Sequence, residues 1–207
     1  MLTKEGRPTL ADGIALGLIA TGAVSVAIGA VVAVVTAAFE VFGAAPTVSM
    51  PVHDVELTAL DDVAGVSAAT VDSALVTVPA MSSGARWMLL LETTLPALAT
   101  VALCAGVWWL GVSLIRSRPF RASLGWLFAV AACLMIAGSL FGQLAGGIGR
   151  AIIVQDLTAA SPGAEDVLWT LLVQFDLAPV GWAFALALVA GLFEIGRRLQ
   201  RDTEGLV

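Results

Sequence analysis

Residues 122–149 read ASLGWLFAVAACLMIAGSLFGQLAGGIG and contain no charged side chain over 28 positions. A helix needs about 20 apolar residues to cross the hydrocarbon core of a bilayer. In lipid, every backbone polar group must find its partner within the segment, so such a run forms a helix despite its glycines and valines. This stretch therefore predicts a membrane-spanning helix and decides the class of the fold.

Three further uncharged runs occupy residues 13–39, 93–115 and 177–193. The last run is short, and it reaches the required length if the helix continues through Glu194, whose carboxylate can pair with an arginine one turn later. We therefore predict an all-α membrane protein, a four-helix transmembrane bundle that forms a single domain over residues 1–207.

The predicted spans cover about residues 13–39, 87–115, 122–148 and 177–200. Two longer loops, residues 40–86 and 149–176, connect spans on one side of the membrane. The connections on the other side are short.

The loop of residues 40–86 has the alternation of a strand in two places. The apolar members of the two alternating runs are Val48, Met50 and Val52, and then Ala74, Val76 and Val78. A lone hairpin is only marginally stable in water. We therefore predict a small module of two short antiparallel strands that packs on the membrane domain.

The loop of residues 149–176 contains a second apolar piece. Residues 167–175 are too short to span a bilayer, and we predict that they form a half-helix in the membrane interface. Asp176 follows this piece and is a good N-cap for the fourth span.

Basic residues indicate the orientation of the chain. Eight of the ten fall on one side of the predicted topology, namely Lys4, Arg7, Arg116, Arg118, Arg121, Arg197, Arg198 and Arg201. Only Arg86 and Arg150 fall on the other side, together with eleven of the sixteen acidic residues. The positive-inside rule then predicts a multi-pass protein of the cell membrane with both termini in the cytoplasm. The acidic outer side argues against nucleic-acid binding.

The sequence predicts no enzyme, no cofactor and no metal site. His53 is the only histidine, and no serine is identifiable as a nucleophile beside it. Cys104 and Cys133 both fall inside spans, where we interpret them as apolar packing residues. Glu92, one turn inside the second span, is an ionisable candidate, but a solvated carboxylate at a helix end is the simpler interpretation.

A ridge of glycines marks the third span. Gly138, Gly142 and Gly146 recur every four residues and form a smooth groove. Small residues at this spacing let two helix backbones approach closely. We predict that these three glycines are a helix-packing surface.

The cytoplasmic ends carry the candidate interaction residues, which are Arg116, Arg118, Arg121, Arg197, Arg198, Asp202 and Glu204. The arginines can contact anionic lipid headgroups of the bilayer. The mixed tail after Gly196 is more polar than a helix end requires, so it can dock either on the turn of residues 116–121 or on a protein partner in or at the membrane.

Two stretches resemble a known family. They are RPFR at residues 118–121 and FEIGRRLQRDTEGLV at residues 193–207. Together with the four spans they are similar to the bacterial family catalogued as domain of unknown function 2975, although Glu194 and Ile195 stand where a basic pair is expected. The resemblance covers most of the chain. It implies a cytoplasmic-membrane protein without assigned catalytic residues.

Two hypotheses about function follow. The first is a non-enzymatic interaction, regulatory or sensory protein that reads a cue through its outer module. The alternative is a small transporter or permease subunit, which normally needs several ionisable groups at mid-depth. The absence of charge from residues 93–115 and 122–149 favours the first.

Overall fold

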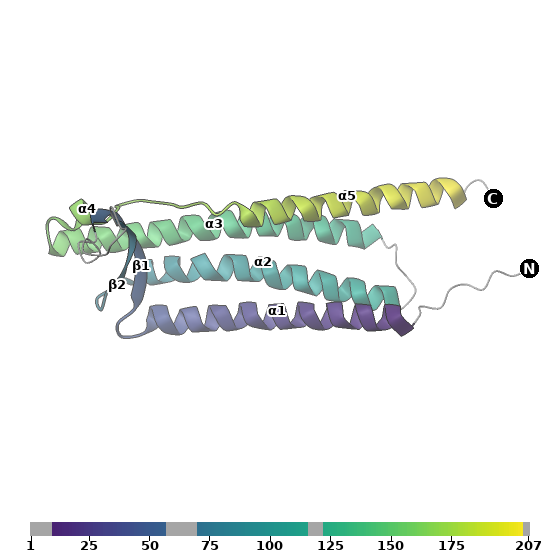
Figure 1. Cartoon of the computed structure of the whole chain (residues 1–207), viewed down its shortest axis with the longest axis horizontal. Helices are drawn as coiled ribbons and strands as arrows, with labels where there is room; N and C mark the ends of the chain where they lie inside the picture. The colour runs from purple at the N-terminus through teal and green to yellow at the C-terminus, as the bar shows by residue number, and fades with distance from the viewer. Residues whose placement is uncertain (1–9, 57–69, 116–121, 205–207) are drawn as a thin grey trace, which may run out of the picture. The chain divides into compact units, whose positions relative to one another are not determined.

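The computed structural model describes residues 10–56, 70–115 and 122–204. The elements are α1 (Leu10–Phe42), β1 (Thr47–Glu56), β2 (Thr70–Thr77), α2 (Ser83–Ile115), α3 (Ala122–Ala160), α4 (Ala164–Val167) and α5 (Ala178–Glu204) (Figure 1). Within these ranges, α1, α2, α3 and α5 are long and apolar enough to cross a membrane. The predicted fold, four spanning helices with a two-stranded antiparallel sheet, is confirmed.

The chain divides into two compact units. Residues 1–33, 95–139 and 176–207 form the first, which we call the helix unit. Residues 34–94 and 140–175 form the second, which we call the hairpin unit.

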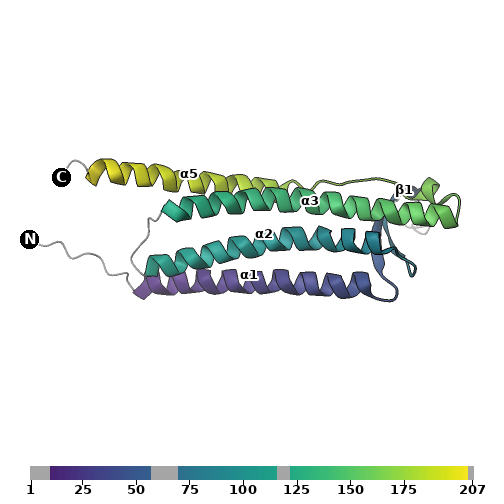
Figure 2. The ribbon, with the colours of Figure 1, turned by 180° about the vertical axis from the view of Figure 1, so that it is seen from behind.

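The helix unit packs through small side chains. A Cβ atom added at Gly106 of α2 would lie 3.0 Å from Cδ2 of Leu127 in α3, so these two helices are in close contact. One added at Gly125 of α3 would lie 3.7 Å from the carbonyl oxygen of Ala190 in α5, and Figure 2 shows α5 running beside α3. The buried residues described in this unit are Ala99, Cys104, Gly106, Gly111, Phe128, Ala131, Ala132, Ser139, Ala183 and Ala190. This composition is typical of helices that associate in lipid by close backbone approach.

The hairpin unit has a core of larger side chains. β1 and β2 pair in antiparallel register from Thr47 opposite Thr77 to Pro51 opposite Ser73. As the alternation predicted, one face of the sheet is buried. It packs on the start of α2 and the end of α3, in a cluster of Val48, Met50, Val52, Val78, Met81, Ala85, Leu89, Ile153, Val154 and Leu168. These helix ends supply the support that a lone hairpin lacks.

The third long helix continues past the predicted end of its span at Ile148 and stops only at Ala160. Ile153 and Val154, in this extension, are almost fully buried in the hairpin core. The core of the hairpin unit therefore includes residues beyond the predicted span, a contact that hydropathy alone does not report.

The predicted half-helix over residues 167–175 is wrong. Only α4, a single turn that ends at Val167, is helical there. Leu168 bridges to Val52, and the backbone nitrogen of Trp169 donates to the carbonyl oxygen of Pro51 at 3.3 Å. The segment follows β1 because its backbone groups bond to the strand. Asp176 lies one residue before the N-cap position of α5, and its Oδ1 accepts a hydrogen bond from the nitrogen of Ala178 at 2.9 Å.

Candidate functional site

A polar pocket lies within the hairpin unit. Its volume is about 340 Å³. It is lined by Ser49 and Pro51 of β1, Asp72 and Ser73 of β2, Glu92 of α2, Gln143 and Arg150 of α3, and Leu172 and Gln174 of the segment before α5. Ser49, Asp72, Ser73 and Gln174 are exposed, so the pocket is open to solvent.

An ion pair forms one wall of this pocket. Nη2 of Arg150 lies 2.8 Å from Oε1 and 3.0 Å from Oε2 of Glu92, and Nε of Arg150 donates to the carbonyl oxygen of Ser49 at 3.2 Å. One guanidinium thus connects α3 to both α2 and β1. The Arg150 and Glu92 side chains are 26% and 30% exposed, so the pair is partly screened by water. The prediction of a solvated helix-end carboxylate at Glu92 missed this partner.

Gly146 makes room for the ion pair. A Cβ atom added at Gly146 would collide with the carboxylate of Glu92. The two other glycines of the predicted packing ridge lie in different surroundings. A Cβ at Gly138 would lie 2.8 Å from the carbonyl oxygen of Leu95, which is a close helix–helix approach, and Gly142 is buried. Gly138 therefore allows two helix backbones to approach closely, and Gly146 leaves space for the charged side chain of Glu92.

An irregularity in the sheet carries Asp72. Pro51 pairs with Ser73 and Val55 pairs with Val71, so three residues of β1 face the single residue Asp72 of β2. Bulges of this kind bend a strand and re-aim a side chain. Here the residue opposite the bulge lines the pocket.

Arg86 ties α1 to α2 within the same unit. Its Nη1 donates to the carbonyl oxygens of Val41 at 2.7 Å and Gly43 at 3.1 Å, at the end of α1. These carbonyls lack partners in the helix, and a cation there also interacts favourably with the helix dipole. Nearby, Phe42 and Trp87 meet edge to face with ring centroids 5.2 Å apart.

His53 contacts the segment that follows α4. Its ring stacks on Trp169, with centroids 4.0 Å apart and an interplanar angle of 27°. The stack adds to the backbone bonds that hold the segment after α4 on β1. Among the described residues, no group of three or more histidine, cysteine, aspartate or glutamate side chains is placed to hold a metal ion. Cys104 and Cys133 are free thiols.

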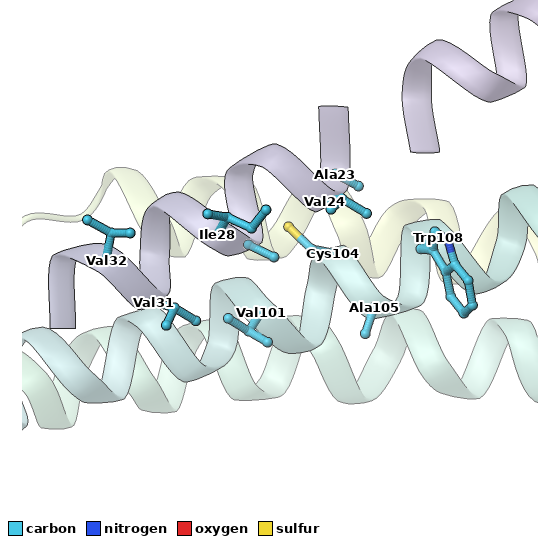
Figure 3. A pocket seen from close by; sticks show the side chains of 10 residues that line it. Ala23, Val24, Ile28, Val31, Val32, Val101, Cys104, Ala105 and Trp108 are labelled. Carbon is cyan, nitrogen blue, oxygen red and sulfur yellow. The ribbon is translucent and has the colours of Figure 1, made fainter. Parts of the chain in front are cut away.

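An apolar groove lies in the helix unit, between α1 and α2 (Figure 3). Its volume is about 400 Å³, and Figure 3 shows Val24, Ile28 and Val32 of α1 around it with Val101 and Cys104 of α2. Specific ligand sites combine apolar walls with a few placed polar groups. The polar pocket has such groups, whereas the groove is lined almost entirely by hydrocarbon, so the polar pocket is the candidate site.

The structure describes only some of the predicted interaction residues. Arg116, Arg118 and Arg121 lie outside the described residues. Arg197, Arg198, Asp202 and Glu204 belong to α5, whose helical backbone continues to Glu204, while their side chains lie outside the description.

Sequence reasoning missed Arg150, Asp72, Ser49 and Gln174 as members of one site. One signal pointed to Arg150, because it and Arg86 are the two basic residues that the positive-inside rule leaves on the acidic side. Both turn out to be used in contacts within the hairpin unit.

Comparison with protein-family models, with curated proteins and with solved structures finds no match to this chain.

Proposed function

We propose that this protein is a non-enzymatic sensory or interaction protein of the bacterial cytoplasmic membrane, and that the hairpin unit reads an outer cue through its polar pocket. The observation that carries the proposal is the pocket itself. A chain with only 13% charged residues places a guanidinium and two carboxylates around one solvent-open cavity, at the end of helices that are otherwise apolar.

The orientation in this proposal has both termini in the cytoplasm. It rests on the distribution of lysine and arginine, eight of which lie in the short segments of one side. The relationship to the four-span family is part of the proposal as well, and it rests on the RPFR and FEIGRRLQRDTEGLV stretches. The transporter alternative is less well supported because residues 93–115 and 122–149 contain no ionisable group other than cysteine.

Reporter fusions test the orientation. A fusion after Val207 should be active only with a cytoplasmic reporter, and a fusion near Asp62 only with an outer one. A cytoplasmic signal near Asp62 would overturn the proposed direction of sensing.

Copurification from native membranes tests the interaction role. We expect the intact protein to retain a partner that is lost from the Arg116→Gln/Arg118→Gln/Arg121→Gln variant and from a chain lacking residues 202–207. Arg7→Gln, which removes one basic residue from the same predicted side, is the control and should retain it. Equal retention by all variants, or no retained protein, would contradict the proposed role of the cytoplasmic ends.

A further inference from the structure

The charges around the polar pocket do not cancel. Glu92 and Arg150 offset each other, and Asp72 adds one further negative charge, so the pocket carries a net charge of −1. Asp72 has no basic partner among the described residues, and its side chain is exposed. The electrostatics of the pocket therefore favour a cationic group beside Asp72.

Arg150 nevertheless retains donors for an anion. A guanidinium carries five N–H groups. Nε donates to Ser49, and Nη2 donates to the two carboxylate oxygens of Glu92. Nη1 makes no hydrogen bond to any residue that the structure describes, so its two N–H groups remain for a ligand oxygen. Arginine suits phosphate oxygens through its planar array of donors.

A ligand with a single charge can pair with only one of the two groups, either Asp72 or Nη1 of Arg150. A simple anion would meet a pocket of net negative charge. A simple cation would leave Nη1 of Arg150 without an acceptor, in a pocket where the hydroxyl of Ser73 and the amides of Gln143 and Gln174 supply further neutral polar contacts. A ligand that carries both charges matches both ends.

The volume and the position of the pocket restrict the class of ligand that it can bind. Its volume of about 340 Å³ is near the lower end of ordinary ligand pockets. Glu92 and Arg150 belong to the long apolar stretches Ser83–Val112 and Gly125–Ala160. The site is therefore built from helices that are long and apolar enough to span a membrane, and the predicted third span ends at Ile148, two residues before Arg150.

We propose that the polar pocket binds a zwitterion in which a phosphodiester contacts Nη1 of Arg150 and a primary ammonium contacts Asp72. This chemistry is present in the headgroup of phosphatidylethanolamine and in free glycerophosphoethanolamine. The assignment rests on the proposed sensing role of the pocket, whereas binding itself is measured on purified protein without a partner.

The experiment titrates glycerophosphoethanolamine into the full chain in detergent and follows binding by calorimetry and by the melting temperature. Ethanolamine and glycerophosphoglycerol, which carry the primary ammonium and the phosphodiester respectively, are the matched probes. We expect the zwitterion to bind at least tenfold more tightly than either half, as the gain of one charge-assisted hydrogen bond gives about tenfold. Asp72→Asn should lose about tenfold in affinity, and Asp156→Asn, an exposed acid of α3 that does not line the pocket, should bind as the intact protein does.

Nanodiscs separate the two sources of the ligand. If the headgroup is the occupant, free probe binds in phosphatidylglycerol discs and is excluded from phosphatidylethanolamine discs. If the free molecule is the ligand, it binds equally in both. Either result supports the site. Equal affinity for the zwitterion and for one of its halves, unchanged affinity in Asp72→Asn, or no binding in detergent and in both discs would overturn it, and none of these results affects the copurification test.

Discussion

The helix unit and the hairpin unit bury their apolar side chains in different ways. In the hairpin unit, Met50, Ile153 and Val154 are almost completely enclosed by other parts of the chain. In the helix unit, α1 leaves Leu18, Ile19 and other large side chains more than half exposed. The first pattern is that of a water-soluble core, and the second is that of a surface covered by lipid. The hairpin unit thus buries its apolar side chains against one another, whereas the helix unit leaves large apolar side chains on its surface, as suits contact with lipid.

The glycines of α1 and α3 differ in their surroundings as well. Gly138 and Gly146 of α3 lie where any side chain would meet a neighbour, and at Gly29 of α1 an added Cβ would have nothing within 4 Å. Of these three glycines, only the two of α3 are in close contact with another helix among the described residues.

The largest expected effect compares two isoleucines. Ile153→Ala removes a side chain that is 1% exposed and leaves a cavity in the hairpin core, whereas Ile19→Ala trims one that is 56% exposed. We expect Ile153→Ala to cost about 2–5 kcal/mol of stability and Ile19→Ala about 0.5 kcal/mol or less. Thermal unfolding in detergent measures both. Similar losses would mean that α1 is covered by protein rather than by lipid.

A second comparison uses the glycines. Gly138→Leu places a side chain 2.8 Å from the carbonyl oxygen of Leu95, a backbone atom that does not move without shifting the helix. We expect a loss of about 1–3 kcal/mol, as overpacking generally costs. Gly29→Leu, in open space, is the matched control and should leave the melting temperature unchanged or raise it. If the two variants melt alike, the ridge of α3 is not a packing surface.

The smallest expected effect concerns the ion pair. A double-mutant cycle of Glu92→Gln and Arg150→Met should give a coupling energy of about 1 kcal/mol, because both side chains are partly exposed. The coupling should weaken with added salt. Asp156→Asn combined with Arg150→Met serves as the reference cycle and should show none. A coupling energy near zero would mean that the ion pair between Glu92 and Arg150 does not stabilise the pocket.

The sequence by itself determined the four spanning helices and the two strands. An uncharged run of 28 residues has one stable conformation in lipid, because only a helix pairs all its backbone groups internally. The strands could also be predicted from the sequence, because alternation of apolar and polar residues places one face of a sheet against a core. The buried side chains Val48, Met50 and Val52 confirm that face.

Only the tertiary structure decided the site. Glu92 and Arg150 lie 58 residues apart, and nothing local to either of them reports that α2 and α3 bring their charges within 3 Å. Asp72 reaches the same pocket through an irregular strand pairing. The half-helix predicted over residues 167–175 is lost for a related reason. Packing and hydrogen bonding with β1 outweigh the local preference of those residues, and these contacts depend on the sequence of the partner strand rather than on the segment itself.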